Sequence, residues 1–181
     1  MMDPALIGFR LMTLDDLPLL HRWLETPHVL EWWWGGVAPS YKDVAEKYGP
    51  YTQGESLTDP YLILYAGQPI GYIQTYRIRD YPEYDAAVGA DEVAAGVDLL
   101  IGEADYLHKG LGRHILRRFL REIVFAAEDI VSCIIGPSEA NAIAIRAYEK
   151  AGFRYLKTIP SKNEPTPEYL MRIARADVRD A

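Results

Sequence analysis

The spacing of apolar positions changes along the chain and predicts its elements. Apolar runs bounded by turn residues are typical of strands, and they occur at 6–12, 60–65, 70–78, 96–101, 130–135, 153–158 and 169–173. Four segments instead combine helical spacing with capping residues, at 13–26, 40–51, 110–127 and 141–151. This order of elements predicts an α/β layered domain with a mixed sheet.

Polar and small residues indicate where the helices begin and end. Thr13, with Asp16 three residues later, predicts a capped start for the first helix, and Pro27 predicts its end. Ser40 predicts the start of the second helix, because its hydroxyl can accept a hydrogen bond from a free backbone N–H. Gly152 predicts the end of the last helix, at 141–151.

Two irregular segments interrupt the pattern. The pair Gly35-Gly36 excludes a long element after three consecutive tryptophans, so these rings are expected at a helix end or in a loop. Residues 79–95 are mostly polar and include Pro82 and Gly89, and we expect them to form a long loop. A loop of this length in a compact domain is often functional.

Length and charge narrow the class of protein. The chain has 181 residues, which suits one domain over 1–181. Its formal net charge of -7 disfavours nucleic acid and anionic membranes as partners and favours cationic small molecules. The sequence shows no signal peptide and no transmembrane span, so a cytoplasmic location is expected.

Cys133 is the only cysteine, so one chain can form neither a disulfide nor a cysteine zinc site. It lies in the apolar run 130–135. This position predicts a small buried apolar residue rather than a nucleophile.

The segment Leu-His-Lys-Gly-Leu-Gly-Arg at 107–113 follows a predicted strand and opens a predicted helix. Glycines let the backbone approach an anion closely, and the free N–H groups of a helix start point toward it. Lys109 and Arg113 add positive charge. The segment therefore predicts a pyrophosphate site, although two glycines before a helix also fit a tight turn.

A second motif at 141–153 reads Asn-x-x-Ala-x-x-x-Tyr-Glu-Lys-x-Gly-Phe. Together with Lys-Gly-Leu-Gly at 109–112, it resembles the GCN5-related N-acetyltransferases. That resemblance implies a mixed, mostly antiparallel central sheet flanked by helices, with acetyl-coenzyme A as cosubstrate and no metal. Leu107 departs from the Gln or Arg that the family often has there, a minor difference because backbone amides do most of the pyrophosphate binding.

The resemblance also implies where the coenzyme lies. Backbone at 108–113 would hold the pyrophosphate, the strand at 99–101 would pair with the pantetheine arm, Asn141 would contact that arm, and Tyr148 would lie near the sulfur. The implied coenzyme-binding residues are Leu99, Leu100, Ile101, His108, Lys109, Gly110, Leu111, Gly112, Arg113, Asn141, Ala144 and Tyr148.

Three residues are candidates for the chemistry. Asp98 is a carboxylate inside an apolar strand, which fits either a base that takes a proton from the substrate ammonium or a partly exposed or ion-paired strand position. A base is needed because an amine resembling lysine has a pKa of roughly 10. Tyr148 either donates a proton to the departing thiolate or packs in the core. A backbone N–H near Leu100 would polarise the acetyl oxygen. No covalent enzyme intermediate is required.

A narrower resemblance is to the aminoglycoside 6'-N-acetyltransferases. It rests on short pieces at 10–17, 23–24, 28–33, 69–74, 96–98 and 148–153. It implies a polycationic aminoglycoside as substrate, and hence antibiotic resistance. A site for such a sugar needs carboxylates for ammonium groups and flat aromatic rings for sugar faces. The candidate substrate-binding residues are Trp32, Trp33, Gln74, Tyr76, Asp80, Glu83, Tyr84, Asp98 and Glu139.

Some of these candidates also have structural interpretations. At least one of the three tryptophans is expected to pack in the core, and some of the acids at 80–85 are expected to be solvated only. The aminoglycoside enzymes carry an acid in place of Gly136. Here either Glu139 supplies that charge or the site is less acidic.

Three other functions share parts of this pattern. One is a siderophore-assembly acyltransferase that acts on a hydroxylated lysine, and another is an acetyl-coenzyme A sensor without transferase activity. A protein N-terminal acetyltransferase also acetylates an amine. The acidic segment at 80–85 favours a polycationic substrate over hydroxylysine, and Asp98 with Tyr148 argues against a sensor. We expect either a monomer or a homodimer.

Overall fold

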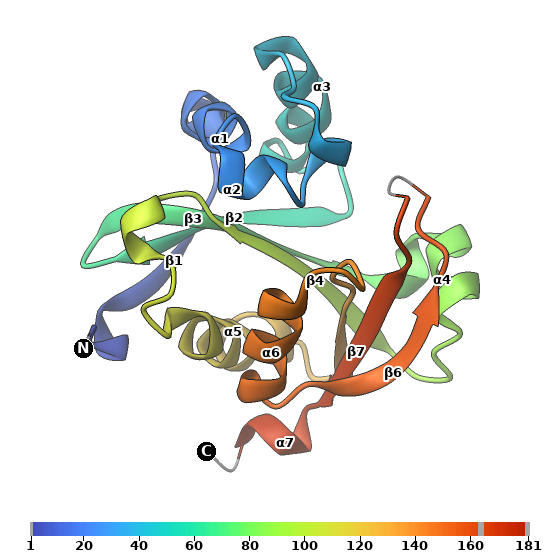
Figure 1. The fold of residues 1–181 in the computed structure, drawn as a ribbon. Helices are drawn as coiled ribbons and strands as arrows, with labels where there is room; N and C mark the ends of the chain where they lie inside the picture. Colours follow the sequence, from blue (N-terminus) through green and yellow to red (C-terminus); the bar gives the residue numbers. More distant parts are fainter. Residues whose placement is uncertain (1, 163–164, 180–181) are drawn as a thin grey trace. The chain divides into compact units, whose positions relative to one another are not determined.

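The computed structural model describes residues 2–162 and 165–179 (Figure 1). Its strands are β1 Ile7–Leu11, β2 Thr58–Tyr65, β3 Gln68–Arg77, β4 Ala94–Ile101, β5 Ser132–Ile135, β6 Arg154–Ile159 and β7 Glu168–Ala174. Its α-helices are α1 Leu17–Leu24, α2 Pro27–Leu30, α3 Tyr41–Thr52, α4 Pro82–Val88, α5 Leu111–Glu122, α6 Ala142–Ala151 and α7 Ala176–Arg179.

The strands follow one another in the order β1-β2-β3-β4-β5-β7-β6. The pair β4–β5 is parallel, and the pairs β1–β2, β5–β7 and β6–β7 are antiparallel. The predicted fold class, a mixed and mostly antiparallel sheet flanked by helices, is confirmed. The seven predicted strands all form, with ends shifted by two residues or fewer.

Contacts divide the chain into two compact units. Unit 1 comprises Met1–Gln74 and Leu99–Lys109, and unit 2 comprises Thr75–Asp98 and Gly110–Ala181. Strands β3 and β4 each contribute residues to both units.

The core of unit 1 forms where α1 and α3 pack on the strands. Helix α1 buries Leu17, Leu20, Trp23 and Leu24. Tyr48 of α3 and Tyr72 of β3 meet edge to face at 5.6 Å between ring centroids. The buried cluster consists of Met12, Leu17, Leu20, Trp23, Leu24, Val29, Val44, Tyr48, Leu62, Tyr72 and Leu100.

The predicted cap before α1 also forms, since the Asp16 carboxylate accepts hydrogen bonds from the backbone N–H and hydroxyl of Thr13. Arg10 pairs with Asp16 at 2.7 Å and lowers the pKa of its carboxyl.

Trp23 of α1 lies over Gly102, the residue that follows β4. A Cβ at position 102 would lie 2.1 Å from the indole, so only glycine leaves room for this ring. The Trp23 Nε1–H donates to the Glu103 carboxylate at 2.8 Å, and Arg22 donates to the same oxygen. These contacts hold α1 against the end of β4 within unit 1.

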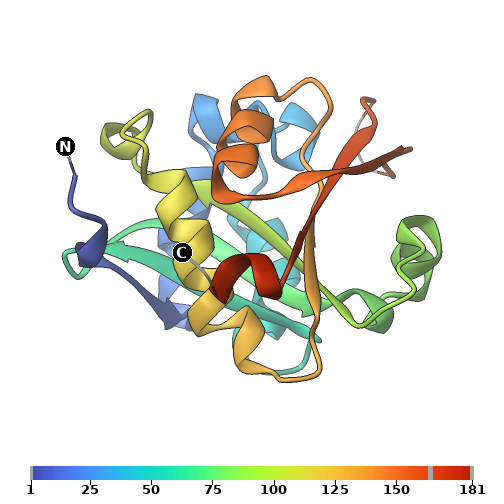
Figure 2. The ribbon, with the colours of Figure 1, turned by 90° about the horizontal axis from the view of Figure 1, so that it is seen from below.

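In unit 2 the amphipathic helix α5 buries one face, formed by Ile115, Leu116, Phe119 and Leu120. The Arg117 guanidinium donates to the Ala151 carbonyl at the end of α6 and to the Asp177 carbonyl in α7. Figure 2 shows α7, drawn in red, beside α5.

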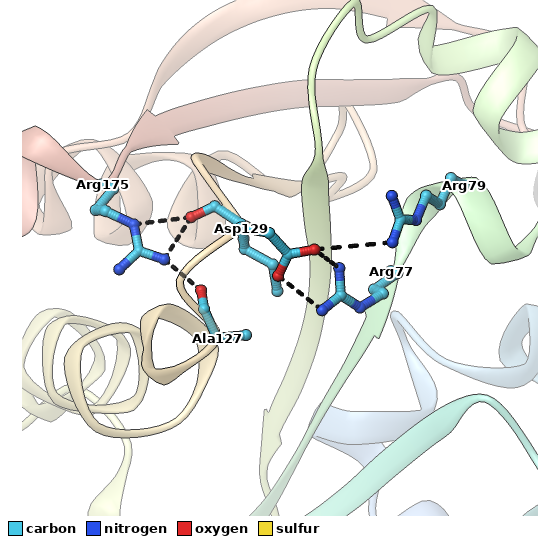
Figure 3. Close-up of polar contacts among 6 residues, drawn as sticks. Arg77, Arg79, Ala127, Asp129 and Arg175 are labelled. Atoms are coloured by element: carbon cyan, nitrogen blue, oxygen red, sulfur yellow. Dashed lines mark hydrogen bonds and ion pairs between the residues drawn. The ribbon is translucent and has the colours of Figure 1, made fainter.

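Two arginine contacts hold the turn that precedes β5 (Figure 3). Arg175 donates to the backbone carbonyls of Phe125, Ala127 and Ile130. From the other side, Arg77 makes a bidentate pair with Asp129 at 2.6 and 2.9 Å. Charged donors thus satisfy carbonyls of the turn, which is a common solution for irregular backbone.

The structure corrects three sequence predictions. Residues 79–95 are not one loop, because Ile78–Asp80 form a short 3-10 helix and Pro82–Val88 form α4. Pro82 occupies the first turn of α4, where its missing N–H costs nothing, and Gly89 ends the helix in the left-handed conformation. Pro27 likewise begins α2 rather than ending α1. Helix α5 ends at Glu122, earlier than predicted.

Gly71 of β3 provides a stability test in unit 1. A Cβ at position 71 would lie 2.3 Å from the Leu100 carbonyl oxygen, a backbone atom that cannot rotate away. Gly71→Ala is therefore expected to lower the free energy of unfolding by about 3 kcal/mol in a urea titration. Gly8→Ala is the matched control, because its nearest atom, the Leu64 Cβ, lies 3.9 Å away. A change of less than about 1 kcal/mol is expected there, and equal stability of both variants would contradict the packing described here.

Candidate functional site

Asp98 and Tyr76 share one face of the sheet in unit 2. Gly96 and Asp98 are two residues apart in β4, so a Cβ at position 96 would point to the same face as the Asp98 side chain. The Tyr76 ring covers Gly96, where a Cβ would lie 2.4 Å from the ring. The glycine thus makes room for an aromatic ring on the face that carries the Asp98 carboxylate.

A chain of hydroxyl hydrogen bonds continues from Tyr76. Its hydroxyl donates to the Tyr84 hydroxyl in α4, and Tyr84 donates to the carboxylate of Glu168 at the start of β7. The ring centroids of Tyr76 and Tyr84 lie 6.4 Å apart. The Ser161 hydroxyl donates to the same carboxylate. Helix α4, which the sequence did not predict, therefore places Tyr84 between a second tyrosine and a second acid.

Gly136 leaves the space that the Glu168 carboxylate occupies. A Cβ at position 136 would lie 2.9 Å from the Glu168 Oε2 and 3.4 Å from the Tyr84 hydroxyl. The sequence left two alternatives here, either a charge from Glu139 or a less acidic site, and the Glu139 side chain is exposed. Sequence reasoning missed Glu168 because its proximity to residue 136 depends on the pairing of β7 beside β5. The glycine itself was the only hint in the sequence.

Burial and the negative charge of Asp98 control protonation on this face. Both effects raise the pKa of the Glu168 carboxyl, burial being the larger. The same two effects raise the pKa of the Tyr76 and Tyr84 phenols, which therefore remain neutral hydrogen-bond donors near neutral pH. The face offers carboxylates together with neutral hydroxyls, a donor set suited to ammonium and hydroxyl groups.

Tyr148 of α6 is affected by Asp98 as well. Burial and then the charge of Asp98 raise the pKa of its phenol, so it keeps its proton and can donate it. The ring lies 6.3 Å from that of Phe153. At the other end of α6, the side-chain oxygen of Asn141 accepts a hydrogen bond from the Ala144 N–H at 3.0 Å. Asn141 is therefore a helix cap, whose side-chain NH2 is the part suited to donate to a ligand.

Cys133 is fully buried in β5, as predicted. Burial raises the pKa of its thiol, and the charge of Asp98 adds to this effect. A protonated, inaccessible thiol is a poor nucleophile, so Cys133 is unsuited to form an acyl intermediate.

The predicted pyrophosphate segment has the backbone that an anion site needs. His108 and Gly110 have φ values of 57° and 76°, and both are exposed. Gly110 precedes α5, whose first turn lacks a side-chain cap among the described residues. Lys109 and Arg113 are exposed, whereas Leu111 is buried and contributes only its backbone. The start of α5 therefore offers free N–H groups and a partial positive charge.

In unit 1 two of the predicted residues meet around Tyr72. Trp33 lies edge to face against this ring at 6.2 Å, and the Tyr72 hydroxyl donates to the Gln74 side-chain oxygen at 2.6 Å. Trp33 and Trp34 both pack partly against the buried cluster, which confirms a core role for at least one tryptophan. Trp32 is half-buried in the turn after α2.

Strand β4 carries the other candidates of unit 1. Leu100 is buried, and its neighbours Leu99 and Ile101 are partly exposed. The Ile101 carbonyl lies 3.0 Å from the His28 Nε2. Among the acids of unit 2, Asp80 acts electrostatically on Arg77, and Glu83 is exposed and paired with Lys162. These contacts agree with a solvated role for part of the acidic segment.

No group of three or more His, Cys, Asp or Glu residues within 2–162 and 165–179 could hold a metal ion. In the same part of the chain no helix has the length and apolar character needed to cross a bilayer.

A family model described as an acetyltransferase (GNAT) domain matches residues 13–160. The chain belongs to the GNAT acetyltransferases. This acetyltransferase is also 36% identical, over 160 residues, to an aminoglycoside N(6')-acetyltransferase type 1 of Klebsiella pneumoniae, covering 88% of this chain and 79% of the relative.

Solved structures of related enzymes show the same fold. This acetyltransferase matches the enzyme AAC(6')-Ib in complex with ribostamycin and coenzyme A with a TM-score of 0.80 and 34% identity. It matches the complex of that enzyme with paromomycin and acetyl-coenzyme A with a TM-score of 0.79 and 34% identity. Each match covers 97% of both chains.

Proposed function

We propose that this acetyltransferase transfers the acetyl group of acetyl-coenzyme A to the 6'-amine of an aminoglycoside. The observation that carries the proposal is the face of unit 2 on which the Asp98 carboxylate acts on neutral tyrosines and a second carboxylate. Such a face suits a sugar that carries several ammonium groups. The names of the relatives support the same substrate class. An enzyme of this kind confers resistance to the antibiotic.

The two compact units act as one domain in this proposal. The matched family segment, residues 13–160, includes most of unit 1 and much of unit 2. The residues assigned to the coenzyme also occur in both units. Residues 108–113 would bind the pyrophosphate, 99–101 the pantetheine arm, and Asn141, Ala144 and Tyr148 the region toward the sulfur. The free N–H groups at the start of α5 support the first assignment.

Asp98 and Tyr148 carry the proton transfers in this proposal. Asp98 takes a proton from the substrate ammonium, and the neutral amine attacks the thioester carbonyl carbon directly. A backbone N–H near Leu100 stabilises the oxyanion, as the sequence predicts. The carbon–sulfur bond then breaks, and the Tyr148 phenol, kept protonated by burial, donates its proton to the thiolate. The nitrogen of the product loses its second proton, which restores the phenol. The buried thiol of Cys133 is left out of the reaction.

Recognition of the sugar is assigned to residues of each unit. In unit 1 these are Trp32, Trp33 and Gln74, where Trp33 and Gln74 already contact Tyr72. In unit 2 they are Tyr76, Tyr84, Asp98 and the half-buried Asp80, with Glu83 and Glu139 as exposed charges. Exposed carboxylates contribute mainly to the long-range electrostatic attraction of the cationic sugar, and salt weakens this attraction.

The proposal is tested by following thiol release from acetyl-coenzyme A with four acceptors: kanamycin, tobramycin, hydroxylysine and a peptide with a free N-terminus. We expect release with at least one aminoglycoside and little with hydroxylysine or the peptide, because neither of these presents several cations on a rigid scaffold. Release with hydroxylysine or the peptide alone would contradict the proposal. Release with none of the four would favour a coenzyme sensor.

Asp98→Asn removes the base but keeps the shape of the side chain. Because the amine must be deprotonated, kcat with kanamycin is expected to fall by about 10²- to 10⁴-fold. Coenzyme A affinity, measured by titration calorimetry, is expected to stay within about twofold, since the substitution does not alter the start of α5. Asp129→Asn, which changes an exposed acid paired with Arg77 far along the chain, is the matched control. An Asp98→Asn enzyme with unchanged kcat would exclude Asp98 as the base.

A further inference from the structure

The carboxylate of Glu168 is an ionisable group that the chemistry of Asp98 and Tyr148 leaves unused. Glu168 and Leu170 are two residues apart in β7, so both side chains point to the same face of the strand. Leu170 belongs to the buried cluster of unit 2 that Tyr76 and Tyr84 pack against. Glu168 therefore lies on the tyrosine-covered face described above, where the charge of Asp98 acts on it.

The local structure keeps this carboxylate in place. Tyr84 and Ser161 donate hydrogen bonds to it from two different segments of unit 2. Gly136 of the segment after β5 leaves it room, because any Cβ there would lie 2.9 Å from its Oε2. Tyr84 is in turn the acceptor of the Tyr76 hydroxyl. A side chain held by two hydrogen-bond donors has little conformational entropy left to lose when a ligand binds.

The described partners of Glu168 are neutral hydroxyls. A carboxylate has about four acceptor sites, and these two donors occupy only part of them. A half-buried carboxylate without full charge compensation is costly, and a bound cation relieves that cost. The site of Glu168 thus favours a ligand with a positive group.

We propose that Glu168 is a specificity-determining residue that binds a second ammonium group of the acceptor, while Asp98 takes a proton from the amine that reacts. The inference rests on the proposed function, and it deepens it by assigning the preference for polycations to a pair of carboxylates on one face. Glu168 takes no part in proton transfer to or from the reacting amine. It contributes to acceptor binding and therefore to KM.

Glu168→Gln tests the assignment because glutamine keeps the length of the side chain and an oxygen that accepts from Tyr84 and Ser161. KM for kanamycin is expected to rise about 10- to 100-fold, while kcat and coenzyme A affinity stay within about twofold. The increase of KM with added salt is expected to be shallower than in the wild type, because one charge–charge contact is gone. A purely structural role of Glu168 would not change the salt dependence.

Two further variants complete the test. Glu128→Gln is the matched control, since Glu128 is an exposed acid of unit 2 that has no role in the proposed site, and it should leave KM within about twofold. Gly136→Ala keeps every charge but puts a Cβ against the Glu168 oxygen, so it should also raise KM with kcat preserved. An unchanged KM in Glu168→Gln, or a fall in kcat as large as the rise in KM, would overturn the inference.

The inference and the proposed function fail in different ways. Wild-type protein that releases no thiol with kanamycin or tobramycin contradicts the proposed function. Wild-type protein that acetylates kanamycin while Glu168→Gln matches its KM contradicts only the role of Glu168.

Discussion

The negative charge of Asp98 on a half-buried sheet face is the interaction on which the chemistry of unit 2 depends. It raises the pKa of Glu168, Tyr76, Tyr84 and Tyr148 together with burial, which is the larger cause for each. The tyrosines consequently stay protonated and act as donors. A face that holds two carboxylates and keeps its hydroxyls neutral attracts cations, and the amine that must be deprotonated is itself a cation.

Glycines make this face possible. Because Gly96 has no Cβ, the Tyr76 ring can lie against it, and because Gly136 has none, the Glu168 carboxylate can lie close to it. Larger residues at either position would push an aromatic ring or an acid away from the sheet. The hydrogen bonds from Tyr76 through Tyr84 to Glu168 then fix the spacing between groups that local sequence does not relate. Backbone features, rather than a contiguous motif, thus decide where the charges lie.

The sequence predicts much of the fold and the parts of the site that depend on local patterns. Strands and caps follow from apolar spacing and from pairs such as Thr13 with Asp16, which form the expected capping box. Helix α4 was missed because its short, polar stretch shows little periodicity between Pro82 and Gly89. Glu168 was missed because its role arises from strand pairing, which brings β7 beside β5 across more than thirty intervening residues.

Acetylation at a defined amine of a polycation is the central claim, and the position of the acetyl group tests it most directly. Kanamycin is incubated with the enzyme and acetyl-coenzyme A and then purified. Two-dimensional NMR of the product identifies the atom that carries the acetyl group. The account predicts a single acetyl group on the 6'-nitrogen. A product acetylated on another nitrogen or on a hydroxyl oxygen, or kanamycin recovered unmodified, would contradict it.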